Sequence, residues 1–270
     1  MNSIAADAGP RVDITVDGPI AAIELYNPKA GNAITRGIYE ELRDTWARIE
    51  QDPKIKVVTF TGHGERFFCT GADVSALANP GTIRRTGEMT GDGWRLTWRM
   101  AHLTKPVVVA VNGIAAGGAL GFVTDADIVL ASRNAKFLDT HVAIGQVCGY
   151  GALRLVNLIG PSEATRIAIS GGALSAERAH QLGLVNELFD TPAQAVAAAR
   201  ATAEKIASAS PMAVRKTLEL LHGLSKPMQE YIIDKAADRA VFSHLQHPDA
   251  TEGARAWLEN RTPRWVDEWN

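Results

Sequence analysis

The sequence Pro-Val-Val-Val-Ala-Val at residues 106–111 runs directly into the glycine-rich sequence Asn-Gly-Ile-Ala-Ala-Gly-Gly-Ala-Leu-Gly at residues 112–121. The first run is short, apolar and rich in β-branched residues, which is typical of a buried strand between helices. The second run follows that strand, and we expect it to open a helix. Because the first N–H groups of a helix have no partner within it, this junction predicts exposed backbone amides.

Segments before and after this junction extend the alternation of strands and helices. Residues 12–16 and 20–25 flank an Asp-Gly-Pro turn and predict a hairpin. Thr35 can cap a helix with apolar residues at every third or fourth position, namely Ile38, Leu42, Trp46 and Ile49. Residues 56–61 and 127–131 predict further buried strands. The chain therefore has the pattern of an α/β protein.

The texture changes at about Thr191, where long alanine-rich helical sequence begins. Pro211 starts another expected helix. We predict a core domain over residues 1–190 and a helical subdomain over residues 191–270. The final segment carries three of the six tryptophans, Trp257, Trp265 and Trp269, in a tail too short to bury them alone. This predicts that the tail packs on another surface, such as a second subunit.

Composition excludes several protein classes. The chain has 270 residues, about two domains or one large domain with an appendage. A hydrophobic content of 46% and a net charge of −2 disfavour disorder and nucleic-acid binding. Two cysteines, Cys69 and Cys148, suit neither a disulfide framework nor a zinc site and favour a reducing, cytoplasmic location. Neither a signal peptide nor a membrane span is predicted.

Four ordered motifs carry a family resemblance. Residues 66–74, Arg-Phe-Phe-Cys-Thr-Gly-Ala-Asp-Val, resemble the F-x-A-G-A-D signature of the crotonase superfamily, the enoyl-CoA hydratase and isomerase relatives. Residues 111–119 resemble that family's V-N-G-x-x-x-G-G-G segment. Residues 176–186 match its Ala-Glu-Arg-Ala-x-x-x-Gly-Leu-Val-Asn pattern, and the ending from Glu252 to Pro263 matches too. Together the motifs cover the chain from about Ile20 to Trp265.

This resemblance implies a fold and a class of substrate. The fold would be a spiral of repeated β-β-α turns followed by a C-terminal helical oligomerisation region. The assembly would be a homotrimer or homohexamer. The substrate would be an acyl-CoA thioester, with coenzyme A as part of the substrate, no separate cofactor and no metal.

The resemblance also places two oxyanion-binding backbone amides, at Ala72 and Gly118. Such amides stabilise a thioester enolate or a tetrahedral oxyanion. Gly71, Gly117 and Gly118 would let the backbone approach the thioester because they lack a Cβ. In the alternative interpretation these glycines only permit tight turns.

Two positions depart from the hydratases of the family. Gly121 and His141 stand where those enzymes carry two glutamates, so plain hydration of a 2-enoyl-CoA is not expected. His141 can act as a base because imidazole titrates near neutral pH. Asp139, two residues earlier, would orient His141 if the chain is extended. Alternatively, His141 makes only a local hydrogen bond, and Asp139 is a solvated or capping residue.

Asp125 lies seven residues after Gly118, on the helical face that begins at the expected oxyanion hole. It is a candidate displaced acid or base, or else a structural carboxylate paired in the interior. Cys148 is interpreted as a small buried thiol rather than a nucleophile.

For coenzyme A, the resemblance points to Lys29 beside the phosphates and to backbone around Thr70, Gly71 and Gly117. Trp257 keeps an aromatic contact of the family's ending. Asn260 replaces a lysine there, so Arg261 or Arg264 would supply the phosphate charge. These cations could equally be solvated surface groups. Residues 79–99, with Trp94 and Trp98, correspond to the acyl-pocket wall, although aromatic residues at this spacing also suit a core.

Three functions are compatible with these residues. The first is an acyl-CoA enzyme with His141 as base, acting in thioester or carbon–carbon bond hydrolysis or in proton transfer. The second is an atypical hydratase or isomerase that uses water or another carboxylate. The third is a non-catalytic oligomer that binds coenzyme A.

Overall fold

The computed structural model describes residues 9–78, 96–225 and 247–266. The strands in these ranges are β1 (Arg11–Asp17), β2 (Ile20–Tyr26), β3 (Val57–Gly62), β4 (Phe67–Cys69), β5 (Val107–Val111), β6 (Ile114–Ala116), β7 (Ile128–Ser132), β8 (Lys136–Leu138), β9 (Leu174–Ser175) and β10 (Glu187–Phe189). The α-helices are α1 (Arg36–Gln51), α2 (Val74–Leu77), α4 (Leu120–Thr124), α5 (Tyr150–Ile159), α6 (Pro161–Ser170), α7 (Ala176–Gln181), α8 (Pro192–Ser208), α9 (Pro211–Ser225) and α11 (Asp249–Leu258). Short 3₁₀ turns are η1 (Pro28–Ala30), η4 (Gly117–Ala119) and η5 (Val142–Ile144).

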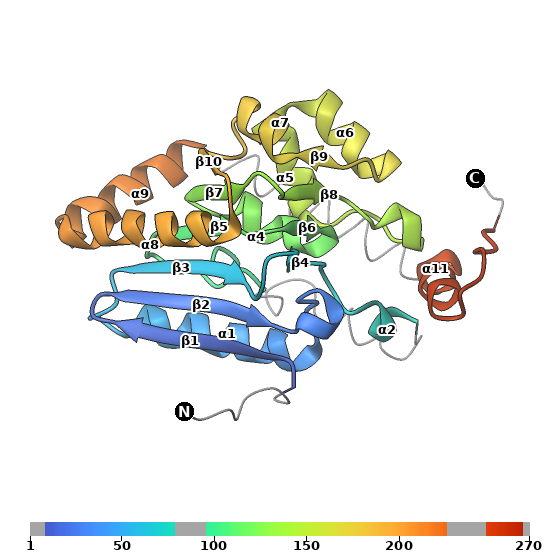
Figure 1. Cartoon of the computed structure of the whole chain (residues 1–270), viewed down its shortest axis with the longest axis horizontal. Helices are drawn as coiled ribbons and strands as arrows, with labels where there is room; N and C mark the ends of the chain where they lie inside the picture. Colours follow the sequence, from blue (N-terminus) through green and yellow to red (C-terminus); the bar gives the residue numbers. More distant parts are fainter. Residues whose placement is uncertain (1–8, 79–95, 226–246, 267–270) are drawn as a thin grey trace.

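The strands form two sheets that the chain visits alternately (Figure 1). A six-stranded sheet has the order β1-β2-β3-β5-β7-β10, and a four-stranded sheet has the order β4-β6-β8-β9. The successive pairs β3–β4, β5–β6 and β7–β8 each add one strand to each sheet. These added strands pair in parallel with their neighbours from the preceding turn. The predicted α/β class and spiral of β-β-α turns are confirmed.

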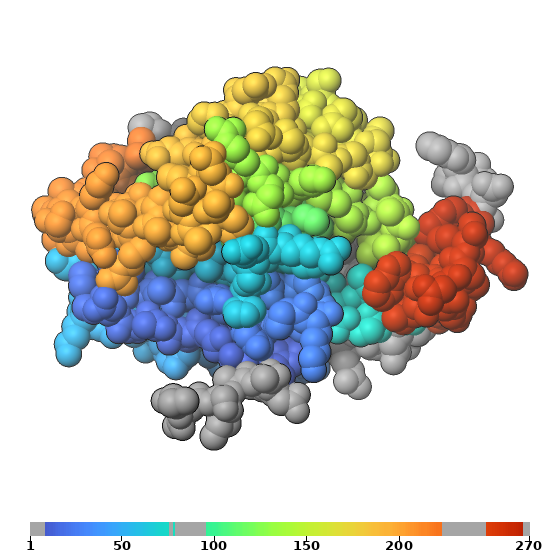
Figure 2. All heavy atoms as spheres, in the orientation of Figure 1, coloured from blue at the N-terminus to red at the C-terminus, as the bar shows by residue number. Residues whose placement is uncertain are grey.

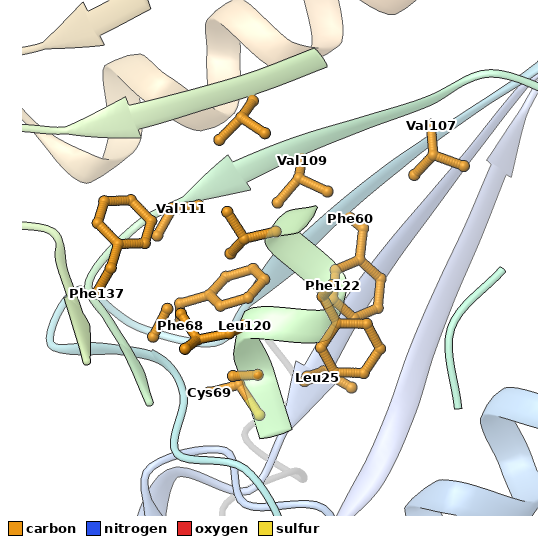
Figure 3. Packing of buried hydrophobic residues seen from close by; sticks show 14 of the residues in the cluster. Leu25, Phe60, Phe68, Cys69, Val107, Val109, Val111, Leu120, Phe122 and Phe137 are labelled. Carbon is orange, nitrogen blue, oxygen red and sulfur yellow. The ribbon is translucent and has the colours of Figure 1, made fainter. Parts of the chain in front are cut away.

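Strand β5 shows how the two layers are built. Val107, Val109 and Val111 belong to a large core cluster with residues of α1 and α4, whereas Val108 and Ala110 belong to a smaller cluster with α8. This period of two follows from the alternation of side chains along a strand. Figure 3 shows Phe60 and Phe122 within the larger cluster, with ring centroids 4.7 Å apart. The central strand is therefore buried on both faces.

Several local predictions are confirmed. β1 and β2 form an antiparallel hairpin in which Asp17 pairs with Ile20. α1 is capped by Thr35, whose side chain accepts a hydrogen bond from the Ile38 amide at 3.2 Å. Pro211 begins α9.

The glycine-rich segment after β5 differs from its prediction. The expected helix does not start directly after the strand, because residues 114–116 first form β6 in the second sheet. β6 pairs with β4 on one side and β8 on the other, so its backbone hydrogen bonds are made across the sheet. The helical turn η4 starts only at Gly117 and continues into α4, which is five residues long.

Helix α8 packs against one face of the six-stranded sheet. Thr191 and Gln194 form a capping box at its start. Its buried face consists of Ala195, Ala199, Ala203 and Ala207. Three of these alanines, from Ala199 onward, pack against side chains of the six-stranded sheet. The predicted boundary after residue 190 therefore marks a change in sequence character. Helix α8, which follows that boundary, packs on the six-stranded sheet of the preceding core.

Helix α11 lies at the end of the molecule opposite α8 and α9 (Figures 1 and 2). It packs against α2 and η5, which directly follow the Ala72 and His141 segments. Gly253 makes this contact close, since a Cβ there would lie 2.3 Å from the Ile144 backbone. In the described ranges, no helix combines the length and apolar character needed to cross a lipid bilayer.

Candidate active site

The Ala72 amide is oriented by a parallel bridge to Ile34. The Ile34 N–H donates to the Gly71 carbonyl at 2.8 Å, and the Ile34 carbonyl accepts from the Asp73 N–H at 3.1 Å. Because both contacts are made by the residues flanking Ala72, its own N–H faces away from Ile34. The loop that carries Ile34 is held by the buried side chain of Asn32, whose amide donates to the carbonyls of His63 and Phe67.

The Gly118 amide lies beside this segment. A Cβ added at Gly71 would lie 2.8 Å from the Gly118 nitrogen, and one added at Gly118 would lie 3.8 Å from the Ala72 nitrogen. Gly71 and Gly117 have φ of +85° and +56°, the left-handed region that favours glycine. Within the described chain, neither the Ala72 nor the Gly118 N–H has a backbone acceptor. The structure thus brings two available amide donors together.

His141 is fixed by Asp139 at the end of β8. The Asp139 Oδ1 atom accepts from the His141 backbone N–H at 2.8 Å and lies 2.6 Å from His141 Nδ1. The Asp139 side chain is fully buried, whereas that of His141 is 21% exposed. The contact was expected from an extended chain, but His141 has helical φ and ψ, and a turn closed by the carboxylate creates it instead.

The other edge of the imidazole, with Cε1 and Nε2, faces the glycines Gly117 and Gly149. A Cβ at Gly117 would lie 3.8 Å from His141 Cε1, and a Cβ at Gly149 would lie 3.8 Å from His141 Nε2. Nδ1 is engaged by Asp139, and Nε2 has no hydrogen-bond partner among the described residues. A carboxylate next to Nδ1 favours the tautomer with the proton on Nδ1, which leaves Nε2 able to accept a proton.

Asp125 lies apart from this group. It is 1% exposed, and its carboxylate is paired with the buried Arg154 and accepts from the Thr97 hydroxyl at 2.5 Å. Its backbone carbonyl accepts from the Trp98 indole at 2.8 Å. Gly121, one turn earlier, is also buried and lies against Gly151. The contacts of Asp125 are those of an internal carboxylate.

The two cysteines have environments that disfavour the thiolate. Complete burial raises the pKa of Cys69 to about 12. Partial burial, together with the nearby Asp139 carboxylate, raises the pKa of Cys148. A reactive cysteine needs a lowered pKa, so both shifts are in the direction that disfavours reactivity.

Thr70 and Lys29 lie in neighbouring loops. The Thr70 N–H donates to the Gly31 carbonyl, and its hydroxyl donates to the Ala30 carbonyl, each at 3.1 Å. These bonds fasten the segment before Ala72 to the exposed η1 turn that carries Lys29. The two predicted coenzyme A contacts are thereby brought to one side of the site.

The C-terminal candidates form a separate group on and after α11. Arg261 pairs with Glu252 at 2.6 Å and with Glu259 at 2.5 Å. The Arg261 side chain and the Arg264 N–H lower the pKa of Glu252 to about 2. Trp257 is 61% exposed. The guanidinium predicted to hold phosphate is thus neutralised by carboxylates of its own chain.

The acyl-pocket prediction is only partly described. Residues 79–95, including Trp94, lie outside the described ranges, as does Trp269 in the tail. Trp98 is 3% exposed and packs edge-on against Trp46 in the core, with ring centroids 5.6 Å apart. In the part of the chain that the structure covers, no group of three or more metal-ligating side chains is assembled.

The sequence did not indicate that the hydroxyl of Thr140 lies close to Gly117. A Cβ at Gly117 would lie 3.1 Å from the Thr140 Oγ1 atom, so this hydroxyl lies beside the residue that precedes the Gly118 amide. The available signal was its position between two candidate residues, Asp139 and His141.

Comparison with known proteins decides the family. The sequence profile of the Enoyl-CoA hydratase/isomerase family matches residues 15–268. The chain belongs to this family. Membership of the crotonase superfamily, predicted from the four motifs, is confirmed, as is assignment to its acyl-CoA enzymes.

Individual relatives cover nearly the whole chain. It is 33% identical to an (E)-benzylidenesuccinyl-CoA hydratase of Thauera aromatica, over 93% of this chain and 97% of the relative. It is 34% identical to a mevalonyl-coenzyme A hydratase of Aspergillus fumigatus, over 91% of each chain. The crystal structure of an enoyl-CoA hydratase/isomerase from Mycobacterium paratuberculosis has a TM-score of 0.70 and 35% identity, over 95% of this chain and 98% of that one.

Proposed function

We propose that this family member transfers a proton at the α-carbon of an acyl-CoA thioester, with His141 as the base. The observation that carries the proposal is the placement of the His141 ring beside Gly117, the residue before the Gly118 amide. An oxyanion site and a base must lie within one thioester's length of each other to act on the same substrate. The Asp139 contact gives the base a fixed orientation.

The proposed reaction uses two groups of the chain in concert. The thioester carbonyl oxygen accepts hydrogen bonds from the Ala72 and Gly118 amides, and His141 Nε2 removes the α-proton. The electron pair of the broken C–H bond moves into the carbonyl group to form an enolate. Each amide donor of this kind contributes ~2.7–4 kcal/mol to the transition state. Asp139 stabilises the imidazolium through the Nδ1 proton.

Coenzyme A enters this proposal as part of the substrate, and no separate cofactor is required. Lys29 and the backbone around Thr70, Gly71 and Gly117 would contact it. We therefore expect tight binding of CoA thioesters and weak binding of the corresponding free acids. Equal affinity for the two in calorimetry would contradict the proposal.

A second candidate function is addition or removal of water, favoured by the printed names of the relatives, which are hydratases. In that reaction His141 would exchange a proton with the α-carbon while water adds at the β-carbon. Gly121 has no side chain that could hold that water. We expect the protein to hydrate crotonyl-CoA poorly or not at all, and efficient hydration would contradict this.

We further propose that the protein forms a trimer or hexamer through its C-terminal region. Trp257 and Leu258 of α11 are exposed by 61% and 45%, and Trp265 by 43%. Aromatic surface of this extent is typical of an interface. A neighbouring subunit would then also complete the coenzyme A site near Trp257 and Arg261.

The decisive experiment measures α-proton exchange in D₂O by mass spectrometry. The exchange panel contains butyryl-, 3-hydroxybutyryl-, acetoacetyl- and cyclohexanecarbonyl-CoA, and crotonyl-CoA is added to test hydration, with products identified by mass. His141→Gln should slow exchange by ~10²-fold or more because an amide cannot take up a proton near neutral pH. Coenzyme A affinity should stay nearly unchanged.

The matched control is His180→Gln. His180 lies on α7, and its ring contacts the Val185 carbonyl at 2.9 Å, a bond that a glutamine can keep. This variant should exchange at the normal rate. Exchange by His141→Gln near the normal rate, or none by the unmodified protein with any member of the panel, would overturn the proposal.

A further inference from the structure

Thr140 brings a hydroxyl close to Gly117, the glycine beside which the His141 ring also lies. The position of a Cβ on Gly117 lies 3.1 Å from Thr140 Oγ1, 3.8 Å from His141 Cε1 and 4.0 Å from the Thr70 carbonyl oxygen. Gly117, Thr70 and the neighbours Thr140 and His141 thus come from three segments far apart in the sequence. Gly117 has a φ of +56°, which favours glycine, and a Cβ there would be in tight contact with the Thr140 hydroxyl.

This hydroxyl is not used to hold the fold. Two other threonine hydroxyls do make such bonds: that of Thr35 caps α1, and that of Thr97 donates to the buried Asp125 carboxylate. Among the described residues, none is within hydrogen-bond distance and geometry of Thr140 Oγ1, and the side chain is half-buried. The turn at the end of β8 is closed by the Asp139 carboxylate, so it needs no bond from Thr140.

A hydroxyl is also chemically suited to this place. It carries one donor and two acceptor sites, and it rotates to meet its partner. The Thr140 hydroxyl lies 3.1 Å from the Cβ position of Gly117, the residue before the Gly118 amide, and Thr140 directly precedes His141 in the chain.

We propose that Thr140 is a catalytic residue whose hydroxyl hydrogen-bonds the thioester end of the bound acyl-CoA. This inference rests on the proposed function, because it uses the same oxyanion amides and the same base. It adds a third polar contact to the reacting group and makes no claim on the nucleotide end. A neutral hydrogen bond of this kind is worth about fivefold to tenfold in rate or affinity.

The test compares Thr140→Val with Thr140→Ser. Valine keeps the β-branched shape and removes only the hydroxyl, whereas serine keeps the hydroxyl. The probe is the panel thioester that exchanges fastest with the unmodified protein. The quantity measured is kcat/KM for α-proton exchange of that thioester in D₂O. We expect Thr140→Val to lower kcat/KM by about fivefold to tenfold and Thr140→Ser to remain within about twofold of normal.

Two further readouts separate a substrate contact from a structural role. Affinity for free coenzyme A, measured by calorimetry, should be the same in both variants, because free coenzyme A lacks the acyl group. The pH profile of kcat/KM and the melting temperature should also stay unchanged. Thr15→Val serves as the control, since it removes an exposed hydroxyl on β1.

The outcomes are distinguishable from failure of the proposed function. Normal kcat/KM in Thr140→Val, equal losses in the valine and serine variants, or a shifted pH profile would each overturn the role of Thr140. If His141→Gln still slows exchange in that case, the proposed function stands. If His141→Gln has no effect either, the proposed function fails with it.

Discussion

At position 139, a single carboxylate oxygen accepts from the backbone and contacts the ring of one residue, His141. The second oxygen, Oδ2, is buried and has no hydrogen-bond partner in the described structure. Burying a carboxylate costs free energy unless the charge is paired and hydrogen-bonded. Its contact with His141 is the pairing that the described structure gives this carboxylate, and it supports the role proposed for Asp139 in orienting the base.

Asp139→Asn should therefore impair exchange while leaving the fold intact. The amide can still close the turn to the His141 N–H but carries no charge to stabilise an imidazolium. We expect kcat for α-proton exchange to fall by on the order of 10²-fold, with circular dichroism unchanged. Asp190→Asn is the control, because that carboxylate is exposed and pairs with Arg133. A loss smaller than threefold in Asp139→Asn would remove Asp139 from the mechanism.

At the scale of elements, the site depends on two loops from different turns of the spiral meeting backbone to backbone. Gly71 follows β4 and Gly118 follows β6, and these strands are parallel neighbours. The loops therefore leave the same edge of the sheet, as parallel strands require. The close contact between Gly71 and the Gly118 nitrogen then sets the spacing of the two amides.

The pair Gly71→Ala and Gly64→Ala tests that close contact. Their φ values, +85° and +83°, impose nearly the same strain of about 1–2 kcal/mol on an alanine. Only at Gly71 does the added Cβ meet another backbone, whereas at Gly64 nothing lies within 4 Å. We expect similar small losses of stability from strain, plus a further loss in Gly71→Ala.

Exchange activity should separate the two variants more strongly. Gly71→Ala must push the Gly118 amide away, and we expect a loss of 10²-fold or more, corresponding to about one oxyanion donor. Gly64→Ala should remain within about threefold of normal. The measurements are urea unfolding for stability and exchange in D₂O for activity. Equal activity in the two variants would show that the approach of the loops does not set the amide geometry.

At the scale of the whole molecule, α11 joins the two halves of the site. It contacts α2 after Ala72 and η5 after His141, while its own Trp257 stays exposed. The apolar surface at this end also includes Val142, which is 39% exposed on η5 next to His141. A subunit seated there would cover the tail and border the site together.

Light scattering should therefore report a trimer or hexamer. Replacing Trp257 and Trp265 together by serine should weaken the assembly, because it removes two large aromatic contacts from the expected interface. Replacing the exposed Met212 and Leu220 of α9 by serine, at the opposite end of the molecule, is the control and should leave the mass unchanged. A stable, active monomer of 28.9 kDa at micromolar concentration would contradict this prediction.

The sequence by itself determined the class of fold and the elements with strong local signals. The hairpin at β1–β2, the cap at Thr35 and the β-branched run of β5 each follow from a few neighbouring residues, so they could be predicted. The motifs around Gly71 and Gly118 were among the four that predicted the family, which the comparison with known proteins then confirmed. The meeting of these motifs at one sheet edge required the strand order, which local sequence does not encode.

Only the tertiary structure decided what the remaining polar residues contact. Asp125 shares a helical face with Gly121 in sequence, yet Arg154 and Thr97 engage its carboxylate in the interior. Thr140 gave no signal of its own, because nothing in the neighbouring sequence shows that its hydroxyl lies beside Gly117. Helical spacing fixes a direction along one element, whereas the partner of a buried side chain depends on which distant segments pack there.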